Sequence, residues 1–359
     1  MSNALISNLP QRYILSGNSA SGGFSDVYFC NDQHLHRKVA IKTIKNKSEL
    51  NRLQDEISAL LQLRSKHVVQ VFDIINIDDS SFGIVMEYIK GKDLFNSDIF
   101  PKSETQLLKI LWQIASGISV IHNAGLIHRD IKPNNMKLDD EGILKIFDFG
   151  LSRNKGTNAA TVGFRGTIEY SAPELFSHDR IVFTSAIDVY AFGAIALFLA
   201  TQKMPHELKK NHFQALPHNS FNCGFLNNKP SLISLFEQSL AMLPEDRPTI
   251  HQLRDELDRY LLADKHQALV VMNGKVHVLN STSRNVKLKL SDIGSFEIHY
   301  NGFYFLLQNV SGEVYINNIK AESDMKILGA CVVGIGNTQR HHNERCFITF
   351  DISNPEVTL

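Results

Sequence analysis

Cysteine is scarce in this sequence, and charge of neither sign is in surplus. The four cysteines among 359 residues lie far apart and form no Cys-x-x-Cys pair, which argues against a zinc knuckle or a thioredoxin-like motif. Thiols used this sparingly are typical of a reduced, intracellular protein. Lys and Arg total 37, as do Asp and Glu. This balance argues against a protein built mainly to coat nucleic acid or an anionic membrane.

Long apolar runs are also missing. Residues 1–15 lack a basic segment followed by an apolar one, so we expect no signal peptide. The best candidate for a membrane span, Ala191 to Ala200, has only about half the length that a spanning helix needs. We expect it to be a buried core helix, and we expect a cytoplasmic protein without a membrane partner.

The pattern of residues changes twice along the chain. Short β-type runs dominate up to about residue 89, with one amphipathic helix expected from Ser48 to Leu63. From Glu104 to Leu262 the pattern is mostly helical. After residue 263, short alternating strands separated by Gly, Asn and Ser predict a β-sandwich or small barrel. We therefore place a domain boundary between residues 262 and 267.

Four short motifs follow one another in an order that chance rarely gives. A lone Asp-Phe-Gly is usually a turn, and a lone lysine on a strand usually lies on a solvated face. The motifs are Val39-Ala40-Ile41-Lys42, His128-Arg129-Asp130-Ile131-Lys132-Pro133-Asn134-Asn135, Asp148-Phe149-Gly150 and Ala172-Pro173-Glu174. Together they resemble the signature set of eukaryotic-like Ser/Thr protein kinases, and the resemblance covers about residues 13–262.

This resemblance implies both a fold and an activity. The fold class is α+β: a bilobal protein-kinase domain over residues 1–262, with a β-rich N-lobe at about 13–86 and a helical C-lobe at about 92–262. A small all-β sandwich would follow at 267–359. The implied activity is transfer of the γ-phosphate of ATP, with Mg²⁺, to Ser or Thr hydroxyls of protein substrates and, by autophosphorylation, of the chain itself. No nucleic-acid partner is expected.

The chemistry of phosphoryl transfer explains the residue types in the second and third motifs. Asp148 and Asn135 offer the oxygen donors that Mg²⁺ prefers. Asp130 is expected to accept or orient the proton of the substrate hydroxyl. Lys132 is expected to present a positive charge to the γ-phosphate as charge moves there.

The glycine-rich loop departs from the GxGxxG pattern, because Ala20 and Ser25 stand at the first and third glycine positions. Small residues still let backbone N–H groups approach phosphates, so we expect ATP to bind with altered affinity. Lys42 would hold the α- and β-phosphates and pair with Glu56 on the amphipathic helix. The resemblance assigns nucleotide contacts to Ala20, Gly22, Gly23, Ser25, Val27, Ala40, Lys42, Met86, Glu87, Ile89 and Asp93.

Within this set, residues 84–94 resemble the hinge between the lobes. Met86 falls at the gatekeeper position, and it is also a natural core methionine. The backbone of Glu87 and Ile89 would bind adenine, and Asp93 would meet the ribose hydroxyls.

The stretch from Asp148 to Glu174 resembles an activation segment. Thr161 is the preferred regulatory phosphosite, whereas Thr167 is expected to contact the catalytic Asp first and to be a phosphosite second. Arg129 could pair with a phosphate on this segment and order it. Equally, Arg129 could pair with a carboxylate in a segment that is always ordered.

Two further residues match structural anchors of the second lobe. By resemblance, Arg247 pairs with Glu174, and Asp188 holds the backbone of His128 and Arg129. These residues are expected to contribute stability rather than chemistry.

The strand order of the tail weakly resembles a forkhead-associated (FHA) domain, a family that reads phosphothreonine through an Arg and a Ser-x-x-His. Here the second motif would be Ser295-Phe296-Glu297-Ile298, without the histidine, and Arg284 is not in the usual Gly-Arg context. A β-sandwich that docks a protein partner or regulates the kinase is the favoured alternative. A metal cluster of His341, His342 and Cys346 is less favoured than a plain solvated hairpin.

Two other functions stay open. One is a pseudokinase, because the glycine loop is atypical, Lys137 stands where the family usually has an apolar residue under the adenine, and Phe147 is bulkier than usual. The aliphatic stem of Lys137 could substitute for the apolar residue. The other is that the β domain does the main task by docking a partner, with the kinase as a switch. A kinase for small molecules is less favoured, because residues 166–174 resemble a peptide-docking end.

Overall fold

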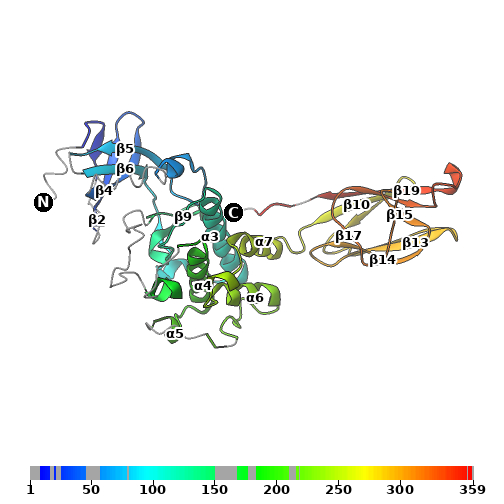
Figure 1. Cartoon of the computed structure of the whole chain (residues 1–359). Coiled ribbons are helices and arrows are strands. Elements are labelled where there is room, and N and C mark those ends of the chain that lie inside the picture. Colours follow the sequence, from blue (N-terminus) through cyan, green and yellow to red (C-terminus); the bar gives the residue numbers. More distant parts are fainter. Residues whose placement is uncertain are drawn as a thin grey trace. The chain divides into compact units, whose positions relative to one another are not determined.

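The computed structural model divides between Leu257 and Asp258 into two compact units (Figure 1), and each is described by itself. The residues that the structure describes are 9–16, 20–21, 26–45, 57–78, 81–149, 168–176, 183–209, 216–217, 219–353 and 355–357.

The first lobe of the first unit is an antiparallel sheet of six strands. Their order is β1 (Tyr13–Leu15), β3 (Asp26–Asp32), β4 (Arg37–Lys45), β6 (Ser81–Glu87) and β5 (Val71–Asn76), and β2 (Ala20–Ser21) pairs with β3. The central strand β4 is buried from Val39 to Thr43 and packs Val39 and Ile41 with Tyr28 and Cys30. Lys42 shares this strand, so its ammonium reaches the site from a rigid position. Residues 57–62 are helical.

The second lobe is mostly helical. Its helices are α3 (Glu104–Asn123), α4 (Ala186–Thr201), α5 (His206–Lys209), α6 (Pro230–Ser239) and α7 (Ile250–Leu261), with short 3-10 turns η1 (Ser97–Ile99), η2 (Pro133–Asn135), η3 (Ile168–Tyr170), η4 (Pro173–Phe176) and η5 (Pro244–Asp246). Strands β7 (Lys92–Asp93), β8 (Met136–Leu138) and β9 (Leu144–Ile146) form a small sheet next to α3. This is the bilobal α+β fold expected from the sequence.

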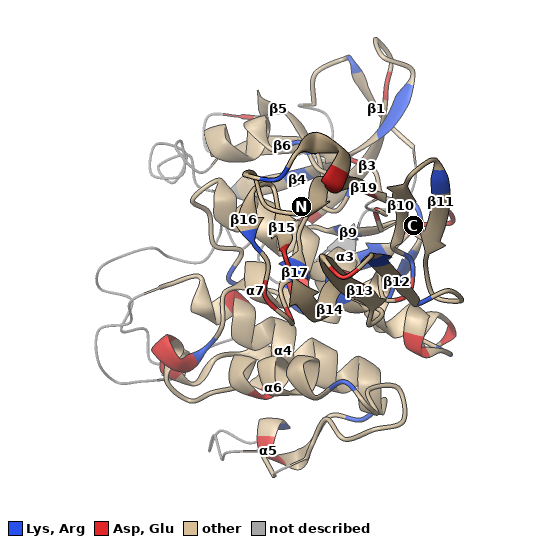
Figure 2. Ribbon diagram, turned by 90° about the vertical axis from the view of Figure 1, so that its right-hand side faces the viewer, with Lys and Arg blue, Asp and Glu red and all other residues tan. Residues whose placement is uncertain are grey.

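Helix α4 is the central helix of this lobe. It is buried from Ile187 to Ala200 and packs against α3 and α6, and Figure 2 shows α4 and α6 almost free of charged residues. Such a helix cannot face water on any side, because every side chain would expose apolar surface. The prediction of a buried core helix at Ala191–Ala200 is therefore confirmed. None of the helices in the described part of the chain is long and apolar enough to cross a membrane.

The second unit is a sandwich of two antiparallel sheets. The six-stranded sheet has the order β11 (Lys275–Leu279), β10 (Gln267–Met272), β19 (Cys346–Ser353), β18 (Cys331–Ile335), β15 (Val314–Ile316) and β16 (Ile319–Lys320). The four-stranded sheet has the order β12 (Asn285–Leu290), β13 (Gly294–Tyr300), β14 (Phe305–Gly312) and β17 (Lys326–Ile327), and η6 (His342–Glu344) precedes β19. Alternate residues of both sheets fill one core that includes Ile298, Tyr300, Phe305 and Phe350. The predicted all-β sandwich is confirmed.

The expected anchor between Arg247 and Glu174 is present in the second lobe. Arg247 Nη1 and Nη2 donate to the two carboxylate oxygens of Glu174, each at 2.8 Å. The Arg247 side chain is fully buried and also donates to the carbonyls of Ala241, Met242 and Ala186. Every polar group of the guanidinium fork is thus used, which is the condition for a buried ion pair to be stable.

We predict that Glu174→Ala lowers the free energy of unfolding of the chain by about 3–5 kcal/mol, because it leaves the Arg247 charge buried without its partner. Chemical denaturation measures this change. The matched control is Asp140→Asn, which breaks the ion pair of Asp140 with Lys90. The side chains of these two residues are 68% and 78% exposed, respectively. This control should change the unfolding free energy by less than about 0.5 kcal/mol. Equal effects of the two variants would contradict the prediction.

Candidate active site

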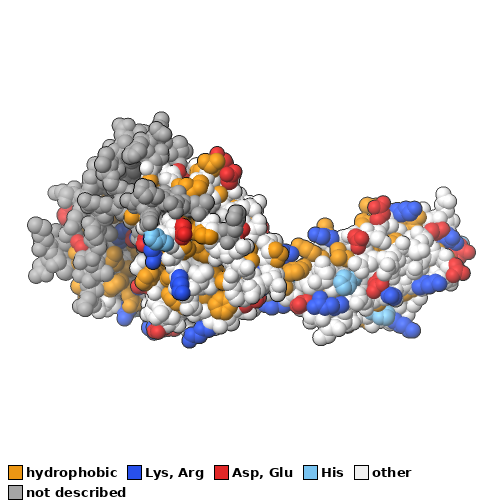
Figure 3. All heavy atoms as spheres, turned by 90° about the horizontal axis from the view of Figure 1, so that it is seen from below, with side chains coloured by type: hydrophobic (Ala, Val, Ile, Leu, Met, Phe, Trp, Pro, Cys, Tyr) orange, Lys and Arg blue, Asp and Glu red, His pale blue; other side chains and the backbone are white. Residues whose placement is uncertain are grey.

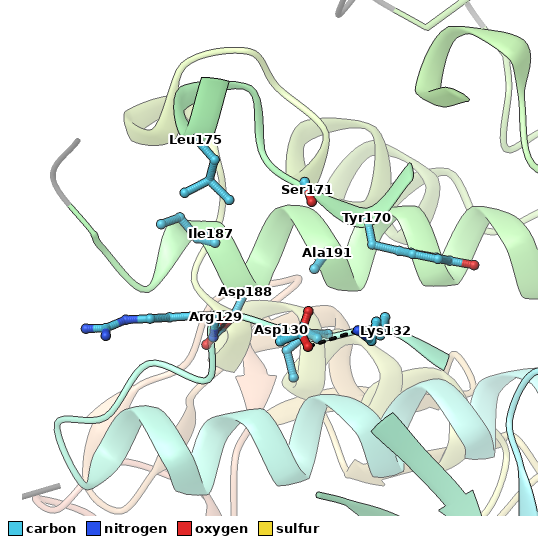
Figure 4. A pocket seen from close by; sticks show the side chains of 10 residues that line it. Arg129, Asp130, Lys132, Tyr170, Ser171, Leu175, Ile187, Asp188 and Ala191 are labelled. Carbon is cyan, nitrogen blue, oxygen red and sulfur yellow. Dashed lines mark hydrogen bonds and ion pairs between the residues drawn. The ribbon is translucent and has the colours of Figure 1, made fainter. Parts of the chain in front are cut away.

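The loop between α3 and β8 gathers three of the predicted catalytic residues. Lys132 Nζ donates to Asp130 Oδ2 at 2.9 Å, a contact drawn in Figure 4. The amide nitrogen of Asn135 donates to the same oxygen at 3.0 Å and to the backbone carbonyl of Asp130 at 2.8 Å. The turn η2, which Pro133 begins, places Asn135 back against Asp130. The carboxylate is therefore fixed in direction by an ammonium and an amide.

The carboxylate of Asp188, on α4, binds the backbone of this loop. Asp188 Oδ2 accepts from the backbone N–H of His128, and its Oδ1 accepts from the N–H of Arg129, each at 2.8 Å. His122, on α3, contributes a third contact through its Nε2, 3.0 Å from Asp188 Oδ2. Asp188 is completely buried. Its negative charge is therefore stabilised by N–H groups of the loop backbone and not by water.

Arg129 and Asp148 have the same unusual backbone conformation. Their φ angles are +67° and +62°, in the left-handed region that non-glycine residues seldom occupy. Such a conformation costs free energy and persists only where surrounding contacts enforce it. At Arg129 the enforcing contact is the Asp188 carboxylate. The strain is located in the two segments that carry the predicted chemistry.

His128 links the two segments. Its Nδ1 lies 3.3 Å from the backbone nitrogen of Asp130, and its Nε2 lies 3.1 Å from the carbonyl of Phe147. The first contact needs an accepting nitrogen and the second needs a donating one, so the ring is neutral with its proton on Nε2. Burial lowers the pKa of His128, in agreement with a neutral ring. The ring also packs on Phe149, with 4.8 Å between centroids.

Across the site, Lys42 Nζ binds Asp148 Oδ1 as an ion pair. The lysine side chain is 8% exposed and the carboxylate 43% exposed. The backbone of Phe147 donates to the carbonyl of Asn135 at 2.9 Å, so Asp148 and Asn135 are held near each other. The cation from the first lobe thus meets a carboxylate from the second.

These side chains fit Mg²⁺ and a nucleotide phosphate. Asn135 uses its amide nitrogen on Asp130, which leaves its Oδ1 as an acceptor. Together with the carboxylate of Asp148 it supplies two hard oxygen donors, and Mg²⁺ usually takes only one or two such protein ligands beside water and phosphate oxygens. Lys42 and Lys132 supply the positive charge that a triphosphate requires.

Most of the described residues predicted to contact the nucleotide lie on β3, β4 and β6. Ala40 is the register partner of Met86, and Val27 is the partner of Lys42. The side chain of Glu87 is held by Lys145 at 2.9 Å. The strands bring these residues together, and their contacts with a nucleotide stay predictions.

Asp93 and Lys137 face each other as register partners across β7 and β8. Lys137 Nζ lies 5.7 Å from the centroid of the Phe147 ring, a cation–π contact. Lys137 and Phe147, the two residues that depart from the family pattern, thus pack against each other. Ile89, beyond the end of β6, is partly exposed.

Several predicted positions fall outside the described residues: Gly22, Gly23, Ser25, Glu56, Thr161 and Thr167. Their roles stay predictions. Of Ala20, only its place on β2 is described.

Sequence reasoning missed His122, Lys145 and Gln70. The backbone nitrogen of Gln70 donates to Glu87 Oε2 at 3.3 Å, beside the contact from Lys145. Each of the three belongs to no motif and supports a motif residue through contacts made only in the folded chain. A histidine near the end of a helix, such as His122, is typical of a favourable charge at the helix C-terminus and carries no signal of its own.

Figure 4 shows a pocket where the catalytic loop faces α4. It is lined by Asp130 and Lys132 from the loop, by Asp188 and Ala191 from α4, and by Tyr170 from η3, among others. Residues of the turns η3 and η4 therefore lie next to the carboxylate that is predicted to be catalytic.

The two predicted features of the tail have a different outcome. Arg284 donates to Asp264 at 2.6 Å, and Ser295 lies inside β13, between β12 and β14. Cys346 is buried and lies 3.6 Å from Asn273 Oδ1. In the described part of the chain no group of three His, Cys, Asp or Glu side chains could hold a metal ion. The hypothesis of a metal cluster of His341, His342 and Cys346 is therefore wrong.

Comparison with known proteins places this site in a family. Residues 18–257 match the model of the protein kinase domain, well over half of the chain. A serine/threonine-protein kinase of Corynebacterium efficiens is 34% identical over 208 residues, covering 54% of this chain and 39% of that protein. The kinase PknA of Corynebacterium glutamicum is 33% identical over 199 residues, covering 51% and 42%.

Among solved structures, Rad53 residues 1–466 in complex with AMP-PNP matches with a TM-score of 0.56 at 24% identity, covering 68% of this chain and 65% of that one. This match concerns the fold alone. The chain spans between about a fifth and about half of the length of the curated relatives it matches. The resemblance drawn from the four motifs is confirmed: the chain belongs to the protein kinase family.

Proposed function

We propose that this chain is a serine/threonine protein kinase that transfers the γ-phosphate of ATP to hydroxyls of protein substrates. The observation that carries the proposal is the fixed carboxylate of Asp130, held by Lys132 and Asn135, with Lys42 and Asp148 paired beside it. The curated relatives that carry serine/threonine-kinase names support the choice of acceptor.

Each of these residues has a distinct task in the proposed reaction. The substrate hydroxyl donates its hydrogen bond to the Asp130 carboxylate and passes its proton there as the new O–P bond forms and the bond to ADP breaks. Lys132 supplies positive charge to the transferring phosphoryl group, and Lys42 holds the α- and β-phosphates. Asp148 and Asn135 would hold Mg²⁺, which would supply positive charge beside the phosphates. Catalysis by such a site is mainly positioning and electrostatic stabilisation.

A pseudokinase is the alternative that the atypical glycine loop and Lys137 suggest. Against it, Lys42, Asp130 and Asp148 are all present in the sequence. The ion pair of Lys42 with Asp148 and the contact of Lys132 with Asp130 support the same choice. The aliphatic stem of Lys137 keeps an apolar surface beside the nucleotide position, since its ammonium is drawn toward Phe147. The site is therefore suited to turnover and not only to nucleotide binding.

For the β-sandwich unit we propose docking of a protein partner rather than recognition of phosphothreonine. The guanidinium of Arg284 pairs with Asp264 and lies 5.7 Å from the Tyr300 ring. Ser295 is fixed in a strand, with a bulge between it and Glu297. Ser295 is therefore not carried by a loop, and the guanidinium of Arg284, in the loop before β12, is already engaged by Asp264.

We predict that Asp130→Ala lowers the rate of phosphate transfer by about 10²–10⁴-fold, because the proton acceptor is lost. Intact-mass spectrometry of the protein and of a generic acceptor protein after incubation with Mg-ATP measures the transfer. The matched control is Asp140→Asn, on the loop after β8, which should behave as the wild type. Wild type that binds ATP without adding phosphate to either protein would instead favour the pseudokinase.

We predict that Asp188→Asn lowers kcat by about 10²-fold with little change in KM for ATP, because an amide can accept from only one of the two backbone N–H groups and the loop is misplaced. The split between kcat and KM separates this positioning role from a loss of fold. Circular dichroism and thermal unfolding report the fold. A proportional loss of kcat and of folded protein would mean that Asp188 is structural only.

We predict that autophosphorylation places phosphate on Thr161. A phosphate there would gain charge-assisted hydrogen bonds to the guanidinium of Arg129. Peptide mapping of the wild type after incubation with Mg-ATP locates the phosphate. Thr161→Ala should lower activity toward the acceptor several-fold, whereas Thr157→Ala should not. Phosphate found elsewhere, with full activity of Thr161→Ala, would contradict the assignment.

A further inference from the structure

The two outer faces of the β-sandwich differ in chemistry. The face of the four-stranded sheet carries Lys287, Lys289, Glu297, His299 and Lys326. Figure 3 looks onto the side of β13 and β14 and shows many charged and few hydrophobic side chains in this unit. The face of the six-stranded sheet carries apolar side chains at the same outward positions. An antiparallel sheet with one solvated face normally has polar residues there, so the six-stranded sheet is the exception.

The register of the six-stranded sheet joins these apolar side chains into one patch. Val276, Val271, Thr349 and Val332 are successive register partners on β11, β10, β19 and β18. Leu269 lies beside them as the partner of Val278. These positions are 59% exposed at Val276 and 40% exposed at both Leu269 and Val332. The patch therefore crosses four neighbouring strands without a charged residue in its central row.

A second row extends the patch toward β15. Phe347 is 51% exposed and is the partner of Gly334, and a Cβ atom at that glycine would lie 3.8 Å from the Phe347 ring. Tyr315 is the next partner along this row. Five of the seven large apolar side chains that are exposed in the described part of this unit lie on this face. Exposed apolar surface gathered on one face marks an interaction site.

Opposite charges mark the two ends of the same face along β19. Side chains at positions 347, 349 and 351 of β19 point to one face, because side-chain direction alternates along a strand. Arg345, directly before β19, has an extended backbone and continues this alternation. Arg345 begins this row and lies 4.8 Å over the Phe347 ring, and Asp351 ends it, exposed. The face is thus apolar in its middle, basic at one end and acidic at the other.

From this pattern we infer that the six-stranded sheet binds the same sheet of a second copy of the chain, which names the partner of the docking function proposed above for this unit. A twofold axis between the sheets, perpendicular to β19 at its middle, reverses the strand direction. Arg345 of each copy then faces Asp351 of the other, and the valine row packs on the row of Phe347. The apolar rows supply the binding free energy, and the two charge pairs select this register.

Sedimentation velocity of the full chain at increasing concentration tests the inference. We expect the wild type to pass from 40.5 kDa to a species of twice that mass. Leu269→Lys should remain monomeric at every concentration. The matched control is Leu328→Lys, which changes an 83% exposed leucine after β17, off the patch, and should associate as the wild type does. A monomeric wild type, or association that Leu269→Lys leaves unchanged, would overturn the inference.

A charge exchange tests the arrangement itself. Arg345→Asp and Asp351→Arg should each weaken association at least tenfold, because each places like charges opposite one another twice. The double variant should recover the wild-type association. The control Lys289→Asp, on the outer face of the other sheet, should have no effect. Failure of the double variant to recover, with both single variants folded by circular dichroism, would overturn the twofold arrangement. Because no readout here depends on phosphate transfer, these results and those of the kinase assay can fail separately.

Discussion

One buried carboxylate, Asp188, sets the position of the catalytic loop. Its two oxygens hold consecutive backbone N–H groups of His128 and Arg129 at 2.8 Å, and this pair of contacts enforces the left-handed backbone at Arg129. Asp130 follows directly, so these contacts set its backbone position, and Lys132 and Asn135 then set the direction of its carboxylate. The cost of burying the charge is offset because all the donors around it are fixed. The proposed chemistry at Asp130 depends on this arrangement.

The sequence predicted those parts of the molecule that depend on local pattern or on motif order. The two-part architecture, the buried helix at Ala191–Ala200 and the pair of Arg247 with Glu174 were all expected, and the structure contains them. What the sequence could not predict are contacts between residues without a motif. His122 reaches Asp188 only because α3 packs on α4, and Lys145 reaches Glu87 only because β9 lies close to the end of β6.

The sandwich illustrates the same division. Alternation predicted strands in the tail, since a buried face repeats every second residue. The alternation is weakest where both faces of a strand are apolar, as in β10 and β18, and there the sequence alone cannot say which face turns inward. Only the pairing shows that Val270 and Val333 fill the core, while Leu269 and Val332 face outward. The hypothesis of a metal cluster is wrong for a related reason, because the side chain of Cys346 is buried in the core of the sandwich.

The ion pair of Lys42 with Asp148 has a consequence for the order in which ligands enter. If a triphosphate without a metal ion paired with the Lys42 ammonium, the Asp148 carboxylate would lose its partner and face additional negative charge. A triphosphate that already carries a divalent cation returns a positive partner to Asp148 at the moment it takes Lys42 away. In the proposed reaction, one ion pair would be exchanged for two only if metal and nucleotide arrived together, so Lys42 and Asp148 would favour the metal-complexed form of the nucleotide.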